Sequence, residues 1–193
     1  MALPPHLSSR LLVGVGSLVV TLGTLRLTLT RPSVPSDLRS WVRRLLGRAR
    51  TDLERGRRTR QWLLVLGWGA LVTVLHFGGL YAGVYTRLFW WDILTHAMGG
   101  AGVAGILFFG LCDRPRTAGP PWWLVGAVAA VGAGFEVYEF LFKSFWYNWT
   151  LRFYAVDTAV DIVVNTLGAV VFVVLLGVWR RRKSRATEGR QRL

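Results

Sequence analysis

Residues 158–179 read TAVDIVVNTLGAVVFVVLLGVW, and this stretch is apolar apart from two threonines, one carboxylate and one amide. An α-helix needs about 20 such residues to cross about 30 Å of hydrocarbon. Inside a bilayer a carboxylate such as Asp161 is costly unless it is paired, hydrated or bound to a metal ion. The stretch therefore predicts a membrane-spanning helix that carries a functional polar face.

Four further stretches of similar length and composition predict four more spans, at 9–29, 62–84, 91–112 and 122–143. Hydrophobic residues make up 52% of the 193-residue chain, and a soluble domain of this size does not need so many unbroken apolar runs. An alternative for the first stretch is a secretory signal peptide, but no A-x-A-like cleavage site follows it. The sequence predicts an all-α integral membrane helical bundle of about five transmembrane helices.

The chain has a net charge of +14. Its basic residues lie mainly in the segments between and after the predicted spans, as membrane topology requires, and do not form a nucleic-acid-binding motif, so we expect no nucleic-acid partner. Residues 31–60 hold ten arginines against three acids, and residues 180–193 hold seven Lys or Arg against one Glu. If these segments and Arg26, Arg114 and Arg116 face the cytoplasm, the basic residues left outside are Arg10, Arg87, Lys143 and Arg152. The positive-inside rule then predicts an outer N-terminus, an inner C-terminus and a location in the plasma membrane.

The chain divides into four expected segments: a first span at 1–30, a basic cytoplasmic linker at 31–61, a four-helix transmembrane core at 62–179 and a basic cytoplasmic tail at 180–193. In the linker, apolar residues recur at helical spacing after Ser36, the expected N-cap. This pattern predicts an amphipathic helix whose residues 39–60 lie on anionic lipids of the inner leaflet. The alternative is a solvated basic linker. We expect the tail to be a disordered anchor.

Polar residues on the last three spans fall at one depth. Each set occupies one helical face, the sets being Asp92 with His96, Glu136 with Glu139, and Asp157 with Asp161 and Asn165. At about 1.5 Å of rise per residue, all of them lie in the outer part of the membrane. We expect these faces to converge on an outward-facing acidic site. Asp157 has an alternative role as the N-cap of the last span, and His76, at the same depth, is either functional or a packing residue.

Carboxylate oxygens together with imidazole nitrogen suit Mg²⁺, Mn²⁺ or Zn²⁺. The candidate metal ligands are Asp92, His96, Glu136, Glu139, Asp157 and Asp161. The candidate catalytic residues are Asp92, His96, Glu136, Glu139, Asp161 and Asn165. The leading hypothesis is a metal-dependent enzyme that activates water against an envelope lipid or a lipid-linked substrate. Two alternatives remain: a transporter or proton/cation-coupled protein that uses the same carboxylates, and a membrane scaffold or sensor with a structural polar cluster.

Three motifs carry a resemblance to a known family: WWDILTHAMGG at 90–100, EVYEF at 136–140 and YAVDTAVDIVVNTLGA at 154–169. They resemble the YjdF-like family of small multi-pass membrane proteins, over roughly residues 62–175. More loosely they are similar to the VanZ-like family, in which an Asp/His-bearing helix and a later D-x-x-x-N-x-x-G-A helix recur. The resemblance implies a multi-pass membrane protein and supports these site residues, but it implies no particular reaction.

Overall fold

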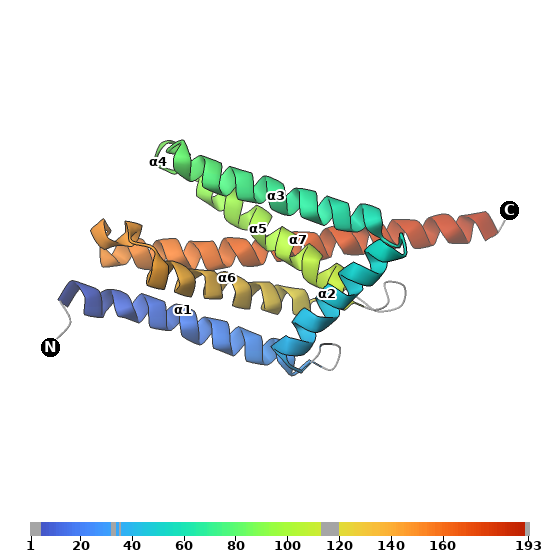
Figure 1. Cartoon of the computed structure of the whole chain (residues 1–193), viewed down its shortest axis with the longest axis horizontal. Helices are drawn as coiled ribbons and strands as arrows, with labels where there is room; N and C mark the ends of the chain where they lie inside the picture. The colour runs from blue at the N-terminus through green and yellow to red at the C-terminus, as the bar shows by residue number, and fades with distance from the viewer. Residues whose placement is uncertain (1–4, 32–33, 35, 113–119, 192–193) are drawn as a thin grey trace.

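The computed structural model describes residues 5–31, 34, 36–112 and 120–191, and these residues form helices and connecting turns without any strand (Figure 1). The elements are α1 (Pro5–Leu29), α2 (Leu38–Glu54), α3 (Thr59–Tyr81), α4 (Val84–Arg87), α5 (Trp90–Leu111), α6 (Trp123–Phe142), the 3₁₀ turn η1 (Phe145–Asn148) and α7 (Leu151–Gln191). Five of them, α1, α3, α5, α6 and α7, are long and apolar enough to cross a membrane. The predicted all-α bundle of five membrane-spanning helices is confirmed.

The start of α7 differs from the expectation. The helix begins at Leu151, about two turns before residue 158, because the Thr150 hydroxyl caps it by accepting a hydrogen bond from the Phe153 backbone N–H at 3.2 Å. Asp157 therefore lies inside the helix, and its expected role as an N-cap is wrong.

The other end of α7 also differs from the expectation. The helix continues as far as Gln191, where a disordered tail was expected. Residues 180–191 are mostly strong helix formers such as Arg, Lys, Ala and Gln, and they extend a helix that is already nucleated. Disorder was the wrong prediction for this part of the tail.

The boundaries of α2 and α3 shift by smaller amounts. The N-cap of α2 is Asp37, not the expected Ser36, because an Asp37 carboxylate oxygen accepts from the Ser40 backbone N–H at 2.8 Å. The helix α3 ends at Tyr81, short of residue 84, because Gly83 takes a left-handed conformation with φ of 65° and turns the chain into α4.

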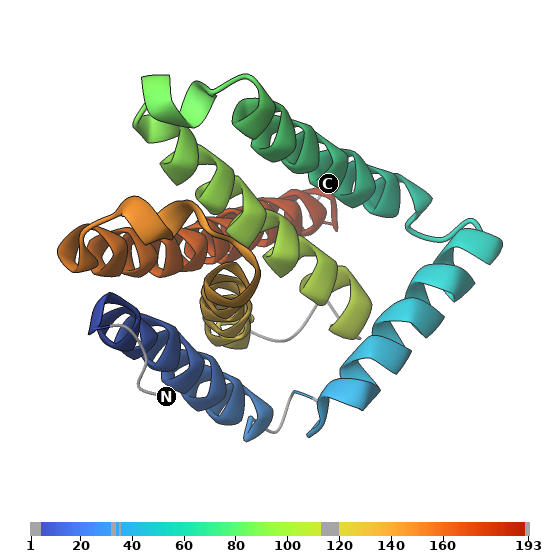
Figure 2. The same ribbon diagram turned by 60° about the vertical axis from the view of Figure 1, so that its left-hand side comes forward.

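The helices α5 and α7 form the central pair, with α6 packed on α7, α1 on α6 and α3 on α5 (Figures 1 and 2). Glycines permit the central contact. A Cβ atom at Gly100 would clash with the backbone of Asn165, and one at Gly168 would clash with the carbonyl oxygen of Ala97. Such small residues let membrane helices approach closely where lipid offers no hydrophobic drive for association.

The basic helix α2 lies obliquely across one end of this bundle (Figures 1 and 2). Trp41 is buried there with its ring edge toward Trp123, at 5.7 Å between ring centroids. Arg48 donates to the carbonyl of Cys112 at 2.9 Å. Other apolar side chains of α2 stay exposed, namely Leu38, Val42, Leu46 and Leu53. One apolar part of α2 therefore packs on the bundle and another is free to meet a bilayer, while contact with anionic lipids stays a prediction.

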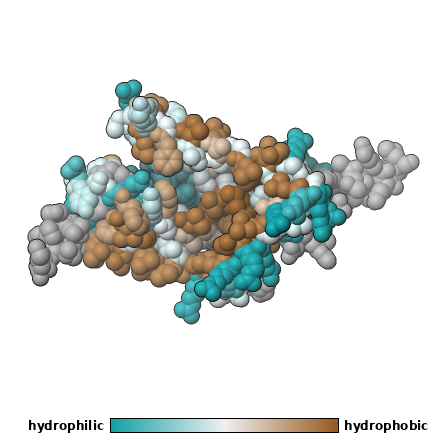
Figure 3. All heavy atoms as spheres, viewed as in Figure 1, coloured by the Kyte–Doolittle hydropathy of each residue, from teal (hydrophilic) through white to brown (hydrophobic). Residues whose placement is uncertain are grey.

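Charge and hydropathy are arranged along the bundle as a membrane requires. Figure 3 shows apolar atoms over the middle of the helices, with hydrophilic residues toward the ends, including the end where α2 lies. At the opposite end the Arg10 guanidinium donates to the Trp149 carbonyl, which ties α1 to the turn between η1 and α7. The predicted inner-side residues Arg114 and Arg116 lie outside the described residues. The outer N-terminus and inner C-terminus stay predictions.

Candidate functional site

The structure brings Asp92, His96 and Asp161 together at the contact between α5 and α7. His96 Nε2 lies 3.3 Å from Asp92 Oδ1 and 3.6 Å from Asp161 Oδ2. Each residue offers one ligand atom, and the three atoms lie within 4.8 Å of one another. His96 and Asp161 are buried, and the Asp92 side chain is 31% exposed. Two residues from one span and one from another thus form a compact cluster, which we call the Asp–His–Asp cluster.

The close contact between the backbones of α5 and α7 brings the residues of this cluster together. His96 lies one helical turn before Gly100, and Asp161 lies one turn before Asn165, the residue that Gly100 touches. Because neither glycine contact leaves room for a Cβ atom, the adjoining turns of α5 and α7 are also close. A helix pair held further apart by larger side chains would separate the imidazole from the Asp161 carboxylate.

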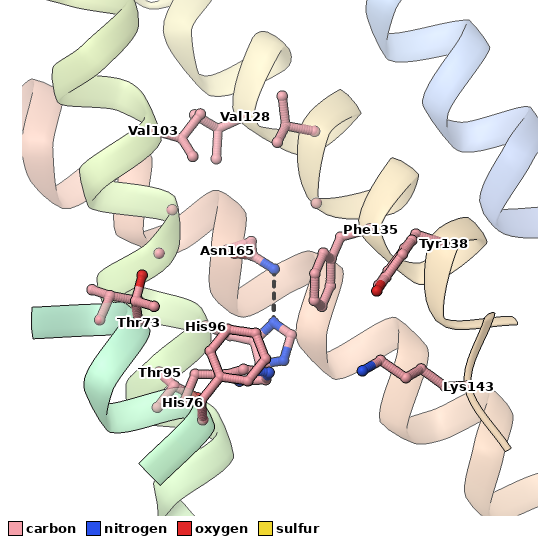
Figure 4. Close-up of a pocket in the computed structure, with 16 residues that line it drawn as sticks. Thr73, His76, Thr95, His96, Val103, Val128, Phe135, Tyr138, Lys143 and Asn165 are labelled. Carbon is pink, nitrogen blue, oxygen red and sulfur yellow. Dashed lines mark hydrogen bonds between the residues drawn. The ribbon is translucent and has the colours of Figure 1, made fainter. Parts of the chain in front are cut away.

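Asn165 holds the imidazole from its other side. The Asn165 Nδ2 atom donates to the Asp161 carbonyl at 2.9 Å and lies 2.9 Å from His96 Nδ1, the bond drawn in Figure 4. With the amide in this orientation, Nδ1 accepts a hydrogen bond and Nε2 carries the proton. With the amide turned over, Nδ1–H would donate to the amide oxygen and leave the Nε2 lone pair toward the carboxylates. The orientation of the Asn165 amide therefore determines whether His96 Nε2 carries a proton or presents a lone pair to the carboxylates.

The acidic residues of α6 stand beside the cluster. Glu136 is 2% exposed, and its Oε1 atom has no hydrogen-bond partner among the described residues. It lies close enough to Asp161, Glu139 and His96 to interact with them electrostatically. Glu139 and Asp157 are only partly buried and are not members of the Asp–His–Asp cluster. A buried carboxylate oxygen is costly without a partner, so Glu136 needs a proton or a cation.

The distances in the cluster suit the ligands of one metal ion. Charge-assisted hydrogen bonds between nitrogen and oxygen measure about 2.7–2.9 Å, and both separations at His96 Nε2 are longer. Ligands bound to Zn²⁺ at about 2.0–2.1 Å in a tetrahedron stand about 3.4 Å apart, which lies between the two observed values. Two carboxylates and an imidazole, with Glu136 adjacent, are also a donor set that suits Zn²⁺ or Mn²⁺. The residues present therefore fit a divalent ion.

A cavity of about 510 Å³ adjoins His96 and is lined by α3, α5, α6 and α7. Figure 4 shows His76, Lys143 and the ring of Phe135 around its polar end. Tyr85, on α4, supports this end: its hydroxyl lies 2.7 Å from His76 Nδ1 and 3.2 Å from Thr95 Oγ1. Burial raises the pKa of Tyr85, which keeps the phenol protonated as a hydrogen-bond donor.

Sequence patterns did not identify Tyr85 as part of the site, nor Thr95 and Tyr138, which line the cavity. Tyr85 lies on a four-residue helix between two spans, where no helical periodicity relates it to the polar faces. Of the basic residues expected on the outer side, Lys143 lines the cavity, whereas Arg152 is exposed and does not. His76 bonds to Tyr85 and lines the cavity as well, and a functional role for it stays a prediction.

The family described as "Predicted membrane protein (DUF2238)" matches residues 52–182, which contain the whole Asp–His–Asp cluster and its cavity. The chain belongs to this family. The DUF2238 family is the YjdF-like family, so that resemblance is confirmed, while the match does not support the looser likeness to VanZ-like proteins. No curated protein and no solved structure matches the chain. The DUF2238 match covers α3 to α7 and leaves out α1 and most of α2.

Proposed function

We propose that this membrane protein is a divalent-metal-dependent enzyme that acts on an envelope lipid or lipid-linked substrate from the outer face. The observation that carries the proposal is the convergence of Asp92 Oδ1, His96 Nε2 and Asp161 Oδ2, which lie within 4.8 Å of one another and suit ligands of one ion. The adjoining cavity gives a substrate access to that point.

Each residue of the site has a distinct role in this proposal. Asp92, His96 and Asp161 would hold the ion, and Asn165, with its amide turned so that its oxygen accepts from Nδ1–H, would orient the imidazole. A bound divalent ion supplies Lewis acidity and a water molecule of lowered pKa. Glu136 adjoins the cluster, with a carboxylate oxygen that has no hydrogen-bond partner in the described part of the chain, and is the candidate to accept a proton from an attacking water.

A proton- or cation-coupled transporter is the second candidate, and the amide of Asn165 favours it. In the structure the Asn165 Nδ2 atom donates to the Asp161 carbonyl, which leaves the proton of His96 on Nε2 toward the two carboxylates. A protonated ring nitrogen cannot bind a metal ion. The two proposals therefore differ in one observable, the stoichiometric binding of metal.

The enzyme proposal predicts cation-dependent release of phosphate from lipid phosphates. We expect detergent-purified protein with Mn²⁺ or Zn²⁺ to hydrolyse at least one member of a panel of phosphatidic acid and prenyl phosphates. The variant His96→Ala should lose about 100-fold or more of that rate, because it removes both an ion ligand and a polarising group. Arg152→Ala is the control, since Arg152 is exposed and does not line the cavity. Equal rates for the wild-type protein and His96→Ala would contradict the proposal.

The orientation predicts which positions a membrane-impermeant thiol reagent reaches in intact cells. In a Cys112→Ser background, Tyr147→Cys on η1 should be labelled, whereas Arg57→Cys, between α2 and α3, should be labelled only after permeabilisation. Both positions are exposed, so accessibility within the fold does not distinguish them. The reverse labelling pattern would place the Asp–His–Asp cluster on the cytoplasmic side.

A further inference from the structure

The cavity beside His96 has a polar end and an apolar end. Its polar end carries His76, Tyr138 and Lys143, and Lys143 extends its ammonium group toward the two imidazoles (Figure 4). Its apolar end is lined by Val72, Val103, Val128 and Val131. Along α5, Val103 lies seven residues beyond His96, which corresponds to about 10 Å of helix. The cavity is therefore elongated along the bundle, with the polar end on the side of η1.

The walls of this cavity are exposed on the side away from the bundle core. The rims are formed by Thr73 and Phe77 on α3 and by Val131 and Phe135 on α6, and all four side chains are exposed. The floor is formed by buried residues such as His96. In the described part of the chain, α3 packs on α5, but α3 and α6 do not pack closely on each other. Since both are membrane-spanning helices, the gap between them faces hydrocarbon.

We propose that this cavity binds a lipid with a phosphate head group, which enters sideways between α3 and α6. The hydrocarbon chain would lie among the four valines, where burial of apolar surface stabilises it. The phosphate would lie at the polar end, where Lys143 and His76 are positioned as donors. This inference rests on the proposed function, because the bound cation would offset the repulsion between the neighbouring carboxylates and a phosphate.

Binding of phosphatidic acid with a photoreactive acyl chain tests the inference. We expect saturable labelling of the purified protein in Mn²⁺-containing detergent, with crosslinks on α3 and α6. Lys143→Ala should weaken binding about tenfold and Lys143→Arg should restore most of it, because a charge-assisted hydrogen bond is lost and regained. Val131→Trp on the rim should block the chain. Val163→Trp is the matched control, because Val163 is similarly exposed but does not line the cavity.

The outcomes separate this inference from the enzyme proposal when the metal content of each sample is measured as well. Binding that is lost in Val131→Trp and kept in Val163→Trp supports the lipid site, with or without metal. Thr73→Trp, on the facing helix, provides a second block if Val131→Trp does not fold. Equal binding by all folded variants overturns the lipid site even where metal is present. Competition by glycerol 3-phosphate as strong as by the lipid also overturns it, because the site would then recognise free phosphate esters.

Discussion

Gly168→Ala is expected to destabilise the protein by about 3 kcal/mol or more, a large effect for a single methyl group. The added Cβ atom would overlap the Ala97 carbonyl oxygen and crowd the Ala101 backbone nitrogen. Backbone atoms in a helix cannot move aside as a flexible side chain does, so α5 and α7 would have to separate. The free energy of unfolding in mixed micelles with increasing SDS measures this loss.

Gly177→Ala is the matched control for that prediction. Gly177 lies on the same helix, and a Cβ atom there would meet nothing within 4 Å. Because alanine has the higher helix propensity, this variant should be neutral or stabilised by up to about 1 kcal/mol. Equal effects of the two substitutions would show that the close contact of α5 and α7 does not hold the bundle together.

Asp161→Asn is expected to abolish stabilisation of the protein by divalent cations. A ligand that binds only the folded state at 100 times its Kd stabilises that state by about 2.7 kcal/mol. Asparagine keeps the shape of the side chain but removes the charge and one of the hard oxygen ligands. Thermal unfolding in detergent, with and without Mn²⁺ or Zn²⁺, should therefore show a rise in Tm for the wild-type protein and none for this variant.

Asp157→Asn, one turn earlier on α7, separates cation binding from a general effect of charge. Asp157 is a partly buried carboxylate of the same helix but is not a member of the Asp–His–Asp cluster. We expect this variant to keep the cation-induced rise in Tm. Loss of the rise in both variants would indicate diffuse binding to an acidic surface rather than a site with defined ligands.

Apolar run length was sufficient to predict the five spans, because a helix in hydrocarbon must satisfy its backbone groups internally over a fixed thickness. It did not predict the start of α7, since the cap Thr150 lies among aromatic residues that also suit a membrane interface. The tail beyond residue 180 was judged by its charge, whereas its helical propensity and the preceding helix determined its structure.

The residues of the site were only partly predictable for a related reason. Spacing of i,i+4 places Asp92 and His96 on one face, and it does the same for Asp157 and Asp161, but it does not fix how far each helix is rotated toward its neighbours. The contact at Gly100 turns Asp161 toward the imidazole and leaves Asp157 at the edge. Tyr85 comes from a segment outside the helical pattern, so only the three-dimensional structure relates it to the cavity.

Metal content by elemental analysis of detergent-purified protein tests the central claim most directly. Wild-type protein, Asp157→Asn and Asp161→Asn are purified side by side without chelators. The Asp–His–Asp cluster predicts about one Zn²⁺ or Mn²⁺ ion per chain in the first two proteins and loss of it in Asp161→Asn. A folded wild-type protein that is free of metal and takes up none on dialysis against these cations would contradict the claim, and would favour proton coupling through His96.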